Sequence, residues 1–242
     1  MIIKAVDFKY PSRKERQLAN QDYPKLLKFG FTGGDMDSIL NGNGSFEIYN
    51  KQNNLAGWDA CFQVKLFDLY QAYINTLTHY NRGVPDGENL TLTQENVINK
   101  IQFDFYSETF YYFFFSVRDV LAQILNIYYD LGMVDTDVTI YKVKEKVQDV
   151  KPLLELFVTA TKEASGIRNS FTHRFPINQP DSRTNLKTEN KKMVLEFRGG
   201  NSTTPETIIK NINASLLHLS TLLEGLKTKI TLQTNHISII QA

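Results

Sequence analysis

The sequence predicts an all-α protein, an up-and-down bundle of four to five helices with an irregular N-terminal extension and a polar insertion before the last helix. Apolar residues recur at three- and four-residue steps over long segments, which is the helical period. Helix start signals precede two of these segments, at Thr93 and at Thr204-Pro205-Glu206. Strands and helices do not alternate along the chain as they do in an α/β enzyme.

Residues 1–54 form the expected extension. They are rich in Gly, Asn, Asp and Lys and hold only short apolar pieces, so we expect irregular structure with a strand or two. Gly33 and Gly34 lack the strand-to-helix setting of a phosphate-binding loop.

The first two helices are expected at 55–80 and 93–131. The first ends before the turn Pro85-Asp86-Gly87, and the second is interrupted or bent near Ser107. Its run from Phe110 to Phe115 is apolar all round. This run must therefore be covered on more than one side, by core and by either the extension or another subunit.

The remaining helices are expected at 138–149, 151–174 and from Thr204 onward. Pro152 is tolerated only in the first turn of a helix, so a new helix must begin near residue 151 and the segments 138–149 and 151–174 are separate helices. Residues 175–203 form the polar insertion, with one short strand at Met193 to Phe197. The predicted domains are accordingly an extension (1–54), a helical bundle (55–229) and a C-terminal tail (230–242).

Charge and cysteine content limit the classes of function. The chain has 27 Lys and Arg against 26 Asp and Glu, a net charge of +1, so any polyanion must be bound by a local basic surface. Cys61 is the only cysteine, which excludes an internal disulfide and a thiolate metal site and indicates a reducing compartment. Signal-peptide and membrane-spanning patterns are missing, so we expect a cytoplasmic protein without a membrane partner.

The stretch from Ala164 to Phe175 contains the most informative residues. Ser165, Asn169 and His173 are spaced by four and therefore form a polar stripe on a helix. Arg168 lies five positions before His173, and its flexible stem can bring the guanidinium toward the imidazole. These residues form an R-x4-H element with a polar residue directly after the arginine.

This element resembles the signature of the HEPN superfamily, a resemblance that covers roughly residues 55–228 and is specific only at the six motif positions. It implies a helical bundle, a homodimer, and in many members a metal-independent ribonuclease of toxin, antiphage or RNA-processing systems. An antitoxin or a nucleotidyltransferase is an expected partner. No metal or other cofactor is expected.

The resemblance implies a role for each motif residue. His173 would take the proton of the ribose 2′-hydroxyl and return one to the leaving 5′-oxygen, since an imidazole exchanges protons near neutral pH. Arg168 would hold the phosphate, and Asn169 would orient His173 or bind the phosphate. The products would be a 2′,3′-cyclic phosphate and a 5′-hydroxyl. Asp119, on the aromatic helix, is assigned to the same catalytic group.

Further residues are predicted to bind the RNA substrate around the motif. Between Lys162 and Arg198 there are eight basic and four acidic residues, a local excess of +4 that suits binding of a phosphate backbone. The predicted substrate-binding residues are Ser165, Thr172, Arg174, Lys191 and Lys192.

Three other interpretations stay open at this point. Basic side chains near a helix C-terminus complement the helix dipole, which is a purely structural role for Arg168 and His173. The chain could be a non-catalytic HEPN-like module that binds a protein or a nucleotide, or a helical structural protein unrelated to nucleic acid. His79, His218 and His236 have no second ligand at metal spacing and are expected to be structural or solvated.

Overall fold

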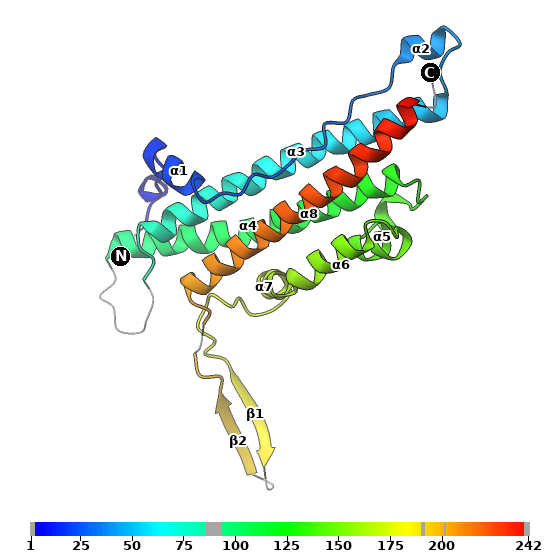
Figure 1. Ribbon diagram of the computed structural model, residues 1–242. Helices are drawn as coiled ribbons and strands as arrows, with labels where there is room; N and C mark the ends of the chain where they lie inside the picture. The colour runs from blue at the N-terminus through cyan, green and yellow to red at the C-terminus, as the bar shows by residue number, and fades with distance from the viewer. Residues whose placement is uncertain (1–2, 86–92, 190–191, 201, 240–242) are drawn as a thin grey trace. The chain divides into compact units, whose positions relative to one another are not determined.

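The computed structural model confirms the all-α class, since the chain is mostly helical with one small two-stranded sheet. It describes residues 3–85, 93–189, 192–200 and 202–239. The α-helices of these residues are α1 (Arg13–Asn20), α2 (Met36–Leu40), α3 (Phe46–Asn81), α4 (Gln94–Tyr128), α5 (Ile140–Lys146), α6 (Lys151–Ala160), α7 (Lys162–His173) and α8 (Pro205–Ile239) (Figure 1). A short 3-10 helix, η1 (Ala5–Asp7), precedes α1, and a second, η2 (Asp135–Asp137), lies between α4 and α5.

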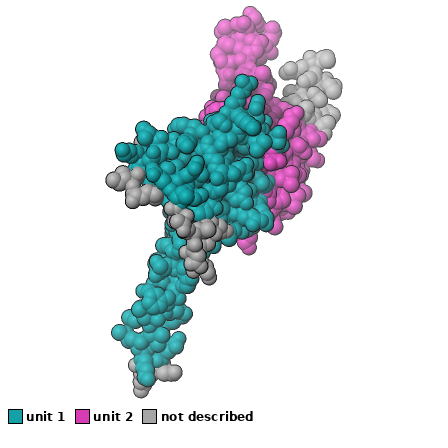
Figure 2. Space-filling view, turned by 90° about the vertical axis from the view of Figure 1, so that its left-hand side faces the viewer, with its two compact units in different colours: residues 1–21, 73–111, 163–213 teal, residues 22–72, 112–162, 214–242 magenta. Residues whose placement is uncertain are grey.

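The chain divides into two compact units, which are coloured separately in Figure 2. Unit 1 comprises residues 1–21, 73–111 and 163–213, and unit 2 comprises residues 22–72, 112–162 and 214–242. The long helices α3, α4 and α8 each contribute residues to both units.

The apolar stripe of α8 is buried as the helical period predicts. Every residue of this stripe is at most 8% exposed, so the stripe faces the core along its length: Ile208, Ile209, Ile212, Leu216, Leu219, Leu222, Leu223 and Leu226. In unit 2 the α8 residue Gly225 lies against Leu153 of α6, where an added Cβ would come within 2.9 Å of the leucine side chain. The small residue therefore allows a close approach of these two helices.

The aromatic run of α4 is covered on more than one side, as expected. Phe110, Tyr111, Phe114 and Phe115 are buried, while Tyr112 is 60% exposed. The helix is continuous through the position where an interruption or bend was predicted, and the Ser107 hydroxyl donates to the Asp104 carbonyl of the same helix at 3.0 Å.

Several predicted helix boundaries differ from the observed ones. The helix predicted at 55–80 begins at Phe46, where Ser45 accepts hydrogen bonds from the N–H groups of the first turn. The predicted helix 151–174 is two helices, α6 and α7, which are separated at Thr161. Both the N–H (3.0 Å) and the hydroxyl (2.8 Å) of Thr161 donate to the Phe157 carbonyl at the end of α6.

The N-terminal extension is irregular between residues 22 and 35, but the expected strands are wrong: residues 3–54 contain helices and no strand. In unit 2 the irregular segment is tied down by side chains. The Asp59 carboxylate accepts from the N–H groups of Gly30 (2.9 Å) and Phe31 (3.1 Å), and Lys227 donates to the carbonyls of Lys28 and Phe29 at 2.7 Å. These bonds satisfy backbone groups that no regular element would pair.

The insertion before α8 folds as a β-hairpin of unit 1. Strands β1 (Thr184–Glu189) and β2 (Lys192–Phe197) pair antiparallel, with Leu186 opposite Leu195. The predicted strand at 193–197 is thus confirmed, and its partner strand was missed. Figure 2 shows the hairpin as a narrow arm of unit 1, and its large apolar side chains on one face are more than half exposed.

Candidate functional site

The helix α7 is held in unit 1 by a buried face of small and apolar side chains. Ala164, Ile167 and Ser170 are buried, and the ring of Phe171 lies 6.1 Å from the ring of Tyr111 on α4. Residues three and four apart share one face of a helix. Packing of this face fixes the rotation of α7 and leaves the R-x4-H side chains on its other sides.

The three motif residues occupy the last two turns of α7. Arg168 and Asn169 are half-buried and His173 is exposed. Nη1 of Arg168 donates to Oδ1 of Asn169 at 3.2 Å. The helix separates the Cα atoms of Arg168 and His173 by about 7.5 Å along its axis and about 140° around it. Asn169 binds Arg168 and lies one turn before His173, so it stands between the two groups.

Three predicted substrate-binding residues lie in or directly after α7. Ser165 is half-buried and one turn before Asn169. Thr172 is exposed, but its hydroxyl donates to the Arg168 carbonyl at 3.0 Å, so its proton is already engaged within the helix. Arg174 directly follows α7, and its side chain is exposed.

A hollow of about 520 Å³ opens beside α7 within unit 1. Gly166, Ser170 and Arg174 line it from α7 at spacings of four, and the segments 175–183 and 202–203 supply the rest. Arg168, Asn169 and His173 are not among the residues that line it. The stripe of Ser165, Asn169 and His173 lies about 100° around the helix from the Gly166 stripe, and Arg168 lies about 160° from Gly166, so the hollow is on a neighbouring side of α7.

The base of the hairpin contributes charge to this hollow. Asp181 accepts from Nε and Nη2 of Arg183 at 2.8 Å each, and Nη1 of Arg198 lies 3.5 Å away. The hydrogen bonds from Arg183, more than the charge of Arg198, hold the pKa of Asp181 well below its usual range. The Arg183 guanidinium also covers the Phe175 ring at 4.4 Å.

These pairs use part of the positive charge that the sequence places between residues 162 and 198. Arg183 and Arg198 share the carboxylate of Asp181, and Lys187 pairs with Glu196 at 2.5 Å across the hairpin. The positive charge at the hollow therefore resides mainly in Arg174, whose guanidinium makes no ion pair with any residue that the structure describes.

Sequence reasoning missed Phe175, Gln179 and Arg183 as residues lining the hollow. Pro176 and Pro180 mark the segment as a turn, but no local pattern indicates that the turn folds back against α7. That contact is tertiary and has no periodic signal.

Asp119 belongs to unit 2, whereas the motif belongs to unit 1. Its exposed carboxylate accepts from Nε (2.9 Å) and Nη2 (2.7 Å) of the neighbouring Arg118. The assignment of Asp119 to the catalytic group stays a prediction.

The two lysines of the predicted substrate site belong to the hairpin. Lys191 lies outside the residues that the structure describes. Lys192 begins β2 opposite Glu189, at the far end of the hairpin from α7. Five residue steps of strand separate it from the hairpin base, a length of about 17 Å. It therefore does not lie with the motif residues.

Among the described residues, the remaining histidines and carboxylates form no second site. His79 is fully buried, and burial, more than any neighbouring charge, lowers its pKa. Its Nδ1 lies 3.3 Å from Oδ1 of Asn99, and its ring stacks on Tyr106. Across the described residues, His, Cys, Asp and Glu side chains nowhere gather in threes as a metal site requires. Within the same residues, every helix is too short or too polar to cross a membrane.

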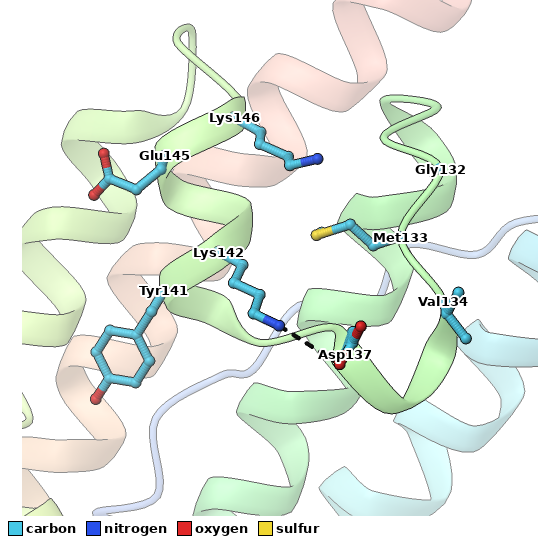
Figure 3. Close-up of a pocket in the computed structure, with 8 residues that line it drawn as sticks. All are labelled: Gly132, Met133, Val134, Asp137, Tyr141, Lys142, Glu145 and Lys146. Carbon is cyan, nitrogen blue, oxygen red and sulfur yellow. Dashed lines mark ion pairs between the residues drawn. The ribbon is translucent and has the colours of Figure 1, made fainter.

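A larger hollow, of about 610 Å³, lies in unit 2 between α5 and the loop before η2 (Figure 3). Lys142 reaches toward Asp137, with an N–O distance of 3.6 Å, while Glu145 points to another side of α5. The lining contains none of the residues that the sequence marked as catalytic or substrate-binding. The motif, with the hollow on a neighbouring side of α7, is therefore the stronger candidate.

Comparison with known proteins agrees with the motif. Residues 58–238 match the family model described as HEPN_Cthe2314-like HEPN, a match that covers most of the chain and includes all of α7. Neither the curated proteins nor the solved structures contain a match. The chain therefore belongs to the HEPN_Cthe2314-like HEPN family.

Proposed function

We propose that this HEPN protein is a metal-independent endoribonuclease whose reaction is carried by α7. HEPN domains are often ribonucleases. The observation that supports the proposal most is the placement of Arg168, Asn169 and the exposed His173 on one helix beside a hollow of about 520 Å³. The imidazole of His173 is exposed, so a phosphodiester can reach it from solvent.

His173 is the proposed acid and base. Its imidazole accepts the proton of the ribose 2′-hydroxyl, the 2′-oxygen forms a bond to phosphorus, and the bond from phosphorus to the 5′-oxygen breaks. The imidazolium returns a proton to the leaving 5′-oxygen. No water is consumed in this step, which leaves a 2′,3′-cyclic phosphate and a 5′-hydroxyl.

Arg168 is the proposed phosphate ligand. Its guanidinium keeps its positive charge at any physiological pH and presents two parallel N–H groups to the non-bridging oxygens, whose charge rises in the transition state. The bond from Arg168 to Asn169 holds the guanidinium on the side of α7 that leads toward His173. Asn169 is thus proposed to position both catalytic groups.

A homodimer is part of the proposal. Within one helix Arg168 and His173 diverge by about 140°, so a site that uses both is more easily formed when two copies face each other. Two inactive variants test this: mixing Arg168→Ala with His173→Ala protein restores cleavage if one site takes its arginine and its histidine from different copies. Absence of restoration in a mixed dimer would contradict a shared site.

The cleavage test uses a mixed RNA pool in EDTA. We expect His173→Ala to lower the rate about 10²- to 10⁴-fold, the usual contribution of general acid–base catalysis. His218, half-buried on α8, provides the matched control, and His218→Ala should cut at the normal rate. Arg168→Lys, which keeps the charge but lacks the fork, should also be slow.

Absence of cleavage by the wild-type protein in every buffer would contradict the nuclease proposal and favour the binding or scaffold module. A fall in thermal stability of several degrees in Arg168→Ala would indicate a structural role for that residue. Toxin–antitoxin or antiphage membership is a narrower proposal, which the protection of cells by a co-expressed antitoxin would test.

A further inference from the structure

An exposed aromatic surface lies in unit 1, away from the residues used so far. Phe8 and Tyr10 of the N-terminal segment, with Ile101, Phe105 and Tyr106 of α4, line a hollow of about 440 Å³. We call these five residues the aromatic platform. Tyr10 is 76% exposed and Phe105 is 62% exposed, so large rings face solvent where apolar side chains are normally covered.

Hydrogen bonds with Arg82 and Gln102 hold the N-terminal part of the platform in place. Arg82 donates to the carbonyls of Lys9 (2.9 Å) and Tyr10 (3.2 Å), and its guanidinium makes two further hydrogen bonds to the Glu15 carboxylate. The N–H of Lys9 donates to Oε1 of Gln102 at 3.4 Å. These contacts fix the chain that carries the first two rings against α4.

The rings on α4 are also fixed. Tyr106 stacks on the buried ring of His79, with centroids 5.9 Å apart and planes inclined by 2°, and Phe105 meets Tyr106 edge-on at 5.2 Å. Ile101 and Phe105 are spaced by four and therefore project from the same side of α4. A ligand would meet a surface that needs no reorganisation, which lowers the entropic cost of binding.

Positive charge flanks the platform. The segment that carries Phe8 and Tyr10 continues into α1, and three exposed cations follow the rings closely in sequence: Lys9, Arg13 and Lys14. The acidic Glu15 of the same segment is already paired with Arg82. Asp7, the other acidic residue here, accepts hydrogen bonds from the N–H of Lys4 and from Gln94. Within the described part of the chain Lys9, Arg13 and Lys14 form no ion pair, so the surface combines exposed aromatic faces with unpaired cations.

This combination is the one by which proteins bind single strands: bases stack on the rings, and Lys and Arg follow the phosphates. An aromatic surface meant for an apolar protein partner does not require a basic border. Phe8 and Tyr10 precede the family match at residues 58–238, so the match does not cover this part of the platform.

We propose that the aromatic platform is a binding surface for single-stranded RNA. The inference rests on the proposed function, because the strand held there is the substrate delivered to α7. Unpaired bases stack on Phe105 and Tyr10, and the cations of residues 9–14 bind the adjoining phosphates. Duplex RNA, whose bases are already stacked, binds the surface poorly.

The test measures binding of a fluorescently labelled single-stranded RNA of mixed sequence by anisotropy, in the His173→Ala background so that the probe stays intact. Phe105→Ala and Tyr10→Ala should each weaken binding about 5- to 150-fold, the loss expected for one stacked base. Phe67 of α3 is 61% exposed, nearly the same as Phe105, and Phe67→Ala is the matched control with unchanged affinity.

A charge variant gives a second readout. Arg13→Ala with Lys14→Ala should lower the slope of log affinity against log salt by about 0.7 for each phosphate that the protein no longer neutralises. Unlabelled single-stranded RNA should displace the probe, and duplex RNA of the same length should not.

The proposal of an RNA-binding platform is overturned if Phe105→Ala and Tyr10→Ala bind the probe as tightly as Phe67→Ala does, or if duplex RNA displaces the probe as well as single-stranded RNA does. It is likewise overturned if these variants lose binding to a protein ligand and keep RNA affinity. Failure of the nuclease proposal looks different: cleavage is then insensitive to His173→Ala, whereas the platform variants still lose RNA affinity.

Discussion

Replacing Glu15 with glutamine measures how strongly the ion pair with Arg82 stabilises the N-terminal segment. The carboxylate accepts from Nε at 2.7 Å and Nη2 at 2.9 Å of Arg82. These hydrogen bonds, assisted by those from Ser12, lower the pKa of Glu15 from 4.5 to about 2. Each pKa unit corresponds to about 1.4 kcal/mol, so without solvent screening the carboxylate would contribute about 3 kcal/mol.

Solvent reduces this value, because the Glu15 side chain is 33% exposed. We expect Glu15→Gln to destabilise the segment by about 1–2 kcal/mol at neutral pH. The folded pKa lies below the unfolded one, so the contribution is fully present above about pH 4.5 and is lost as the pH falls toward 2.

Hydrogen exchange at pH 7 is the direct assay. A loss of 1–2 kcal/mol corresponds to roughly 5- to 30-fold faster exchange of the α1 amides. Between pH 7 and pH 3 the wild type should lose about 1–2 kcal/mol more stability toward urea than Glu15→Gln does, because the variant lacks this one carboxylate. Glu206→Gln, which removes only an exposed i,i+4 pair with Lys210, is the control. Equal α1 exchange in wild type and Glu15→Gln would refute the reasoning.

Two further substitutions test the packing of each unit. In unit 1, Tyr111→Phe removes the hydroxyl that donates to the side-chain carbonyl of Asn211 at 2.9 Å, and it should lower the free energy of urea unfolding by about 1–2 kcal/mol. The control Tyr112→Phe changes an exposed side chain and should have no measurable effect. Equal effects of the two substitutions would contradict the buried hydrogen bond. In unit 2, Asp59→Ala removes the acceptor of two backbone N–H groups of the N-terminal segment and should lower the free energy of unfolding by about 2–4 kcal/mol. The control Asp68→Ala removes a partly exposed i,i+3 pair with Lys65 and should cost less than about 0.5 kcal/mol. A similarly small loss in Asp59→Ala would mean that the segment does not depend on that carboxylate.

Elements with a periodic apolar stripe or a local start signal could be predicted from the sequence. The Thr93 hydroxyl accepts from the N–H of Asn96 at 3.2 Å, and Thr204 accepts from Thr207 at the same distance, as N-caps do. Pro152 lies in the first turn of α6. In each case the decisive contact is within four residues, so the sequence contains all of the information.

Features that depend on distant contacts could not be predicted. The break at Thr161 has neither Gly nor Pro, and its hydroxyl bond back into α6 is also compatible with an uninterrupted helix. The start of α3 was placed late because Asn50, Asn53 and Asn54 are poor helix formers, and tertiary packing overrides that propensity.

The motif itself was found because six adjacent positions carry it, and the family match confirms the assignment of the chain. The hollow beside α7 and the platform at Phe8 and Phe105 join segments that are far apart in sequence. Single-sequence patterns do not encode such long-range contacts, and the assignment of Asp119 to the catalytic group stays a prediction.

The chemistry of the RNA ends produced in EDTA tests the proposed mechanism most directly. Catalysis by Arg168 and His173 predicts a 2′,3′-cyclic phosphate on the upstream fragment and a 5′-hydroxyl on the downstream one, and His173→Ala protein should release these ends at least about 100-fold more slowly. Fragments with a 5′-phosphate, or release of the same ends by the His173→Ala protein at the wild-type rate, would contradict the central claim.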